Sequence, residues 1–269
     1  GTEDGPTGVV DSISLSASSD NSDYDNTVYW VDWTGISFVS GVPGRNGVYD
    51  VQGTITLPDR TVDVTYTGQL TGAQLSGGTD YYVSGNGATW DAEGSGVYTS
   101  AEVGNGPTNY DLLQFNHADS ARTLSFSEPV ENLFFAIVSM NANGYLFDQD
   151  FSIVSSADSA VDRGYFGYTS TYSKTSTGDG RYGISTPSLE PNEFHGILAI
   201  DNAVESLTWT GQSDEFWNGF TIGTYGVAQT ATASGNVLDN DEKDGVDSVL
   251  EVSSVNGTAM VGNSVTLTL

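Results

Sequence analysis

The sequence predicts an all-β protein whose main part is an antiparallel two-sheet sandwich of jelly-roll type. Gly, Tyr, Phe and Trp number 33, 14, 11 and 5 among the 269 residues, and Thr, Ser and Val recur throughout. Several stretches alternate polar and apolar residues with the period of two that is typical of a half-buried strand. No window of about 12 residues shows the 3.6-residue apolar period of an amphipathic helix.

The clearest element is a hairpin over residues 51–68. Thr61–Thr67 reads TVDVTYT and alternates without interruption, and Gly53–Leu57 precedes it. Pro58-Asp59-Arg60 separates the two stretches, and a Pro-Asp pair is typical of a turn.

Further strands follow the same pattern. Arg122–Ser127, Val204–Thr210 and Val265–Leu269 alternate in the same way. Leu133–Val138 is instead continuously apolar between polar flanks, which predicts a strand that is buried on both faces at the centre of a sheet. Trp30, Trp33 and Trp209 lie on strand patterns and are expected in the core.

Long loops rich in Gly, Ser, Asn and Asp are predicted at 16–27, 40–47, 84–96, 102–110 and 156–192. Loops of this length in a compact domain are often functional. Tyr and Trp rings in such loops can stack on the faces of sugars, although each of them can equally be a packing residue. The candidate ligand-binding residues are therefore the loop aromatics Trp90, Tyr165, Tyr168, Tyr172, Tyr182 and Trp217.

Charge narrows the classes of partner. The chain has 35 acidic and 7 basic residues and a net charge of −28, which argues against binding to nucleic acid or anionic membranes. No apolar run approaches the ~20 residues of a membrane span. A surface this acidic is compatible with binding of divalent cations or neutral glycans, or with a saline medium. Alternatively, the charge only keeps the protein soluble. The chain has no Cys, so no disulfide can stabilise it.

The densest negative charge lies between Asp239 and Glu251, after a small polar stretch at Gly226–Ser234. We expect a sandwich domain over 1–226, a linker over 227–234 and a separate segment over 235–269. Calcium takes six to eight oxygen ligands, and a loop crowded with carboxylates can supply several of them. The alternative is a solvated acidic loop. The candidate calcium ligands are Asp239, Asn240, Asp241, Asp244 and Asp247, with a second candidate loop at Asp20, Asp23 and Asp25.

From Gly235 onward, one pattern of residues comprises Gly235–Leu238, Asn240-Asp241, Asp244-Gly245, Asp247, Leu250, Val252 and Ser254–Gly257. Through these residues the segment resembles the opening of calcium-binding cadherin-like repeats of bacterial surface adhesins. Through Ser125–Val130, Leu133–Ser139, Phe147–Phe151 and Phe216–Gly223, residues 28–225 are similar to sandwich domains of secreted, surface-anchored bacterial proteins. These resemblances imply a partial Ig- or cadherin-like β segment, bound calcium, and a place outside the cell or on the surface of a bacterium.

Three functions remain open from the sequence. The preferred one is an extracellular adhesion or glycan-binding module that calcium stabilises. The second is a structural subunit of a filament, sheath or surface layer, in which Val9–Ala17 or Val261–Leu269 pairs with a neighbouring copy. The third is a polysaccharide-acting enzyme, but we predict that the protein is not an enzyme. The two histidines, His117 and His195, have no zinc-site spacing and are expected to be structural.

Overall fold

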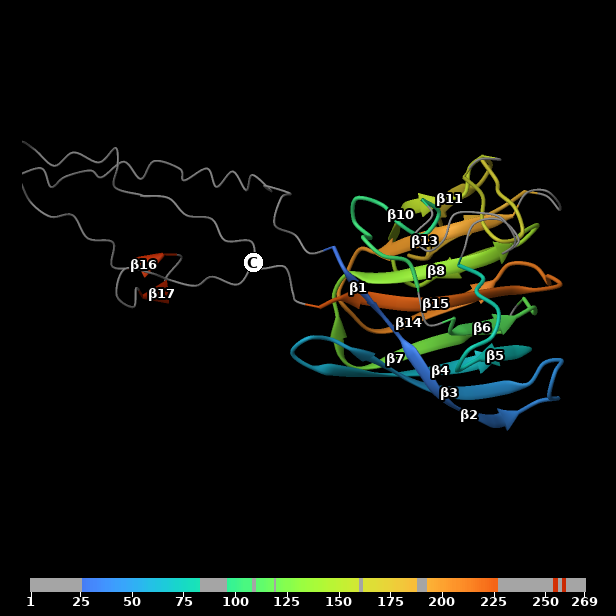
Figure 1. Cartoon of the computed structure of the whole chain (residues 1–269), viewed down its shortest axis with the longest axis horizontal. Helices are drawn as coiled ribbons and strands as arrows, with labels where there is room; N and C mark the ends of the chain where they lie inside the picture. The colour runs from blue at the N-terminus through green and yellow to red at the C-terminus, as the bar shows by residue number, and fades with distance from the viewer. Residues whose placement is uncertain are drawn as a thin grey trace, which may run out of the picture. The chain divides into compact units, whose positions relative to one another are not determined.

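The computed structural model describes residues 26–82, 96–107, 110–118, 120–159, 162–187 and 193–226, together with short strands at 254–255 and 258–259. These residues form two antiparallel sheets packed as a sandwich, and no helix occurs among them (Figure 1). The predicted all-β antiparallel sandwich is therefore confirmed. Within the described ranges, no helix is long and apolar enough to cross a membrane.

The first sheet has seven strands. Its order is β10 (Phe151–Ser156), β13 (Phe194–Ile200), β8 (Leu133–Met140), β15 (Asn218–Tyr225), β6 (Leu112–Phe115) and β5 (Gly72–Gln74), and β1 (Val28–Trp30) also pairs with β15.

The second sheet has eight strands. Its order is β11 (Ser173–Ser176), β12 (Tyr182–Ser185), β9 (Gly144–Phe147), β14 (Val204–Gly211), β7 (Arg122–Val130), β4 (Thr61–Gln69), β3 (Val48–Thr56) and β2 (Asp32–Ser40). A separate two-residue pairing joins β16 (Ser254–Val255) to β17 (Thr258–Ala259).

Alternating side chains from both sheets form a core that is rich in aromatic rings. Phe135 of β8 and Phe220 of β15 stack with centroids 4.7 Å apart. Trp209 of β14 meets each of these rings edge-on at 5.2 Å, and both Trp209 and Trp33 are fully buried. The predicted burial of Trp33 and Trp209 in the core is confirmed, whereas Trp30 is only partly buried.

Strand β8 is buried over its whole length. Its inward side chains join the core between the sheets, and Phe134, Ala136 and Val138 join a second apolar cluster. Tyr82, Tyr98 and other residues of the connecting segments complete that cluster on the outer face of the seven-stranded sheet. The prediction of a central strand buried on both faces is confirmed, and the connections act as a third layer.

One predicted loop is partly wrong. The span 156–192 contains the hairpin of β11 and β12, which extends the second sheet by pairing β12 with β9. The sequence of β11, Ser-Lys-Thr-Ser, shows no apolar alternation, and all four of its residues are exposed. Such an edge strand depends on hydrogen bonds to its neighbour, which periodicity does not reveal.

Candidate binding site

Four aromatic side chains from three separate segments meet on the outer side of the seven-stranded sheet. We call Tyr81, Tyr165, Phe166 and Trp217 the aromatic platform. Tyr81 lies 5.0 Å from Tyr165 and 5.0 Å from Trp217, measured between ring centroids. Phe166 lies 4.8 Å from Tyr165, 5.2 Å from Trp217 and 5.8 Å from Tyr81. The rings therefore form one continuous cluster.

The platform is open to solvent. The side chain of Phe166 is 41% exposed, and the other three rings are partly buried. Phe216, next to Trp217 in the chain, is 98% exposed. Hydrophobic side chains scattered over a surface are ordinary, but a contiguous aromatic group with a fully exposed neighbour is typical of a recognition surface.

His195 of β13 supports the platform from below. Its Nδ1 lies 3.0 Å from the hydroxyl of Tyr98, and its Nε2 accepts a hydrogen bond of 3.4 Å from the backbone N–H of Phe166. Burial lowers the pKa of His195 to about 3, so the imidazole is neutral at physiological pH. A Cβ on Gly164 would lie 2.1 Å from the Cγ of His195, so this loop can approach the ring only as glycine. His195 is therefore fully buried and neutral, and its hydrogen bond holds the backbone of Phe166.

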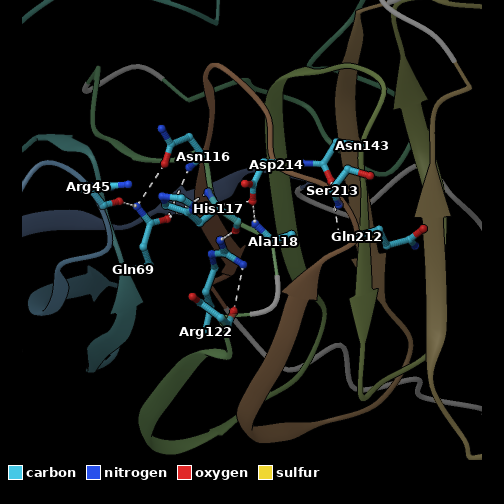
Figure 2. A network of polar contacts seen from close by, with 11 residues as sticks. Arg45, Gln69, Asn116, His117, Ala118, Arg122, Asn143, Gln212, Ser213 and Asp214 are labelled. Carbon is cyan, nitrogen blue, oxygen red and sulfur yellow. Dashed lines mark hydrogen bonds and ion pairs between the residues drawn. The ribbon is translucent and has the colours of Figure 1, made fainter. Parts of the chain in front are cut away.

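Polar contacts hold the connection that carries Phe216 and Trp217 (Figure 2). The Oδ1 atom of Asn143 accepts hydrogen bonds from the backbone N–H groups of Gln212, at 3.2 Å, and Ser213, at 2.9 Å. The Oδ1 atom of Asp214 accepts a bond of 2.8 Å from the N–H of Ala118 and lies 3.4 Å from Nδ1 of His117. The connection is thus fixed to two other loops before it reaches Phe216.

Arg122 fixes the loop on which Ala118 and His117 lie. Its guanidinium donates to the carbonyl oxygens of Ser120 and His117, as Figure 2 shows for His117, and it lies 4.1 Å from the centroid of the Phe115 ring. The side chain is fully buried, and burial lowers its pKa below the usual arginine range. This buried cation is partnered by carbonyl oxygens and an aromatic face, so its role is to hold the turn.

Glu215 anchors the same connection from inside. Its carboxyl oxygens accept hydrogen bonds from the backbone N–H of Asn141, at 2.8 Å, and from the side-chain amides of Asn143, at 3.0 Å, and Asn218, at 2.9 Å. Burial raises the pKa of Glu215 to about 8; the nearby Glu193 adds to the rise, and the three donors oppose it.

Glu193 lies in the same buried network. It accepts a hydrogen bond of 2.6 Å from Ser139 Oγ and a second from the side-chain amide of Asn141. Both glutamates are buried and bonded to several donors. We interpret the pair as a cross-link between loops rather than as an acid–base pair that faces a substrate.

Of the six predicted ligand-binding residues, two belong to the platform and three pack elsewhere. Tyr165 and Trp217 belong to the platform. Tyr168 packs on the outer apolar cluster, Tyr172 meets Phe194 at 5.3 Å, and Tyr182 packs against the core from β12. Trp90 lies outside the described residues.

Two platform residues, Tyr81 and Phe166, are not among the residues predicted from the sequence. Phe166 and the exposed Phe216 beside the platform are phenylalanines, whereas the prediction names only Tyr and Trp, although each of the two adjoins a predicted residue in the chain. Tyr81 follows the turn-rich stretch Gly77-Gly78-Thr79-Asp80, which was a usable loop signal.

All the predicted calcium ligands, Asp239, Asn240, Asp241, Asp244, Asp247, Asp20, Asp23 and Asp25, lie outside the described residues. Within those residues, no group of three or more His, Asp or Glu side chains is placed to hold a metal ion. A hollow of about 400 Å³ lies near Tyr225, at the opposite end of β15 from the platform.

In comparisons of sequence and structure, no family model, no curated protein and no solved structure matches this chain.

Proposed function

We propose that the protein is an extracellular adhesion module of a bacterial surface protein, which binds a neutral glycan at the aromatic platform and which calcium stabilises. One observation carries the glycan part of the proposal. Four rings from distant segments lie within 4.8–5.8 Å of their neighbours at the surface, beside a Phe216 that is 98% exposed.

Aromatic rings bind sugars because the C–H faces of a pyranose pack against the π surface while the hydroxyl groups remain in water. A site that is rigid before binding loses less conformational entropy on association. The hydrogen bonds to Asn143, Asp214 and Glu215 hold the Phe216–Trp217 segment in place, and His195 holds Phe166. The platform therefore has both the chemistry and the preorganisation that sugar stacking needs.

The charge of the chain favours a neutral glycan over an acidic one. A net charge of −28 repels uronic acids and sulfated sugars at long range. Several of the cations are already paired: Lys174 with Asp150, Arg181 with Asp179, and Arg60 with Asp59 and Glu128.

A glycan array followed by titration calorimetry tests the proposal. Phe216→Ala is the sharpest variant, because a side chain this exposed contributes little to folding. We expect it to weaken binding by roughly tenfold, and Trp217→Ala to weaken it further. Phe38→Ala, at a half-exposed phenylalanine of β2, is the matched control and should bind a monovalent oligosaccharide in calorimetry like the wild type. Equal binding by all four proteins, or no glycan bound, would refute the proposal.

Calcium is tested separately. The resemblance of residues 235–257 to cadherin-like repeats and their clustered carboxylates support a calcium site there. Millimolar calcium should raise the melting temperature and a chelator should lower it, and Asp241→Ala or Asp244→Ala should remove much of that difference. Identical melting with calcium and with chelator would show that this part of the proposal is wrong.

The second candidate is a structural subunit assembled by strand exchange. It is favoured by β2, the last strand of its sheet, because no described strand pairs with its outer edge. Electron microscopy of the purified chain should then show ordered polymers, and a chain that remains a small species at high concentration in calcium would exclude this function.

A further inference from the structure

Exposed apolar side chains gather at a second place, far along the chain from the platform residues. Among the described residues, seven large hydrophobic side chains are exposed, and four of them lie on β2 and the turn after it: Ile36, Phe38, Val39 and Val42. Two of the others are Phe166 and Phe216. β2 is the edge strand of the eight-stranded sheet (Figure 1).

Ile36 and Phe38 are exposed although they lie on the core side of their sheet. Ile36 pairs with the fully buried Val51, and Phe38 pairs with Tyr49, whose ring lies 5.5 Å away. Residues paired across two antiparallel strands share a face. Yet Ile36 is 45% and Phe38 is 49% exposed, so no described residue covers this part of the inner face of β2.

This edge lacks the charged side chains that commonly protect an edge strand from pairing. No charged side chain occurs from Trp33 to Gly44, in a chain with 35 acidic residues. The opposite edge of the same sheet, β11, carries Lys174, the kind of charge that discourages strand addition. Two register shifts, one between Trp33 and Gly35 and one between Phe38 and Ser40, leave Gly35–Phe38 as a regular stretch.

We infer that β2 pairs with β2 of a second copy of this chain, antiparallel and related by a two-fold axis at Ser37. Ile36 and Phe38 lie one residue to either side of Ser37, so this register sets Ile36 of each copy opposite Phe38 of the other on the same face. The four side chains then cover one another. An axis between two residues would pair side chains from opposite faces, so it is excluded by the alternation of the strand.

Charge explains why a second copy would meet at this edge. Two chains of net charge −28 repel each other, and the neutral stretch from Trp33 to Gly44 lets two strands approach with the least repulsion. The regular stretch is short, so the dimer is weak and depends on salt. A dimer would carry two aromatic platforms, which would strengthen attachment to a repeating glycan, but the pairing does not depend on glycan binding.

Analytical ultracentrifugation of the full chain tests the inference. We expect a monomer–dimer equilibrium that shifts toward dimer as salt screens the charge. Phe38→Asp should weaken association by roughly tenfold or more, whereas Val42→Asp, which adds the same charge on the turn, should weaken it less. A monomer at every salt and protein concentration, or equal effects of the two variants, would overturn the inference.

Cross-linking tests the register. The chain has no Cys, so Ser37→Cys introduces a single thiol, which should form a disulfide-linked dimer on mild oxidation because the axis sets the two thiols opposite each other. Ser40→Cys should not, because the two copies of Ser40 would lie on opposite sides of the axis, each three residues from it. Association without a Ser37→Cys cross-link would show that another strand, such as Val261–Leu269 of a neighbour, occupies the edge.

Discussion

Replacing Glu215 with Gln should remove a large part of the pH dependence of folding. The Glu215 side chain is buried, and its pKa is raised from 4.5 to about 8, chiefly by burial. The folded chain therefore keeps this proton to about pH 8, whereas the unfolded chain releases it near pH 4.5. The folded state is accordingly disfavoured as the pH rises through this window.

The size of the effect follows from the two pKa values. Each pH unit between them changes the free energy of unfolding by about 1.4 kcal/mol. Between pH 5 and pH 7, Glu215 should therefore cost the wild type about 2.5 kcal/mol of stability. Glutamine cannot titrate, so this contribution to the change of the free energy of unfolding with pH disappears. The variant also places an amide N–H₂ among three donors, which lowers stability by about 1–3 kcal/mol at every pH.

Urea unfolding at several pH values between 5 and 8 measures the difference. The slope is the readout, because the constant cost of the amide cancels from it. Glu205→Gln, at an exposed position of β14, is the matched control and should keep the slope of the wild type. If wild type and Glu215→Gln lose stability in parallel from pH 5 to pH 7, then Glu215 does not hold its proton in the folded state and the reasoning fails.

Three further predictions concern the platform support and the core. Acidification from pH 7 to pH 5 should lower the free energy of unfolding by about 2 kcal/mol through His195, because the unfolded imidazole gains a proton near pH 6.5 and the buried one only near pH 3. A comparison of urea unfolding curves with those of His195→Gln checks this loss. Gly164→Ala should lower the melting temperature and change the near-UV circular dichroism of the aromatic residues, because its Cβ would meet the His195 ring at 2.1 Å, whereas Gly178→Ala, with nothing within 4 Å, should change neither. Trp209→Ala should reduce the free energy of unfolding by about 3–5 kcal/mol, since a fully buried indole leaves a large cavity, and a loss below about 1 kcal/mol would contradict its place in the core.

The sequence by itself determined the fold class and much of the core. Alternation in Thr61–Thr67, Arg122–Ser127 and Val204–Thr210 predicts strands that the structure contains, and Trp209 falls inside as its pattern requires. The continuous apolar run Leu133–Val138 predicts burial on both faces. These inferences succeed because the side-chain direction in a strand depends only on local backbone geometry.

Only the tertiary structure decided which side chains meet and which stay uncovered. Tyr81, Phe166 and Trp217 are far apart in the chain, and their contact depends on how three connections fold over one sheet. Ile36 has the pattern of a core residue and is nonetheless exposed, because β2 lies at the edge of its sheet. Burial and contact depend on residues distant in the chain, so a local pattern predicts the strand but not what covers it.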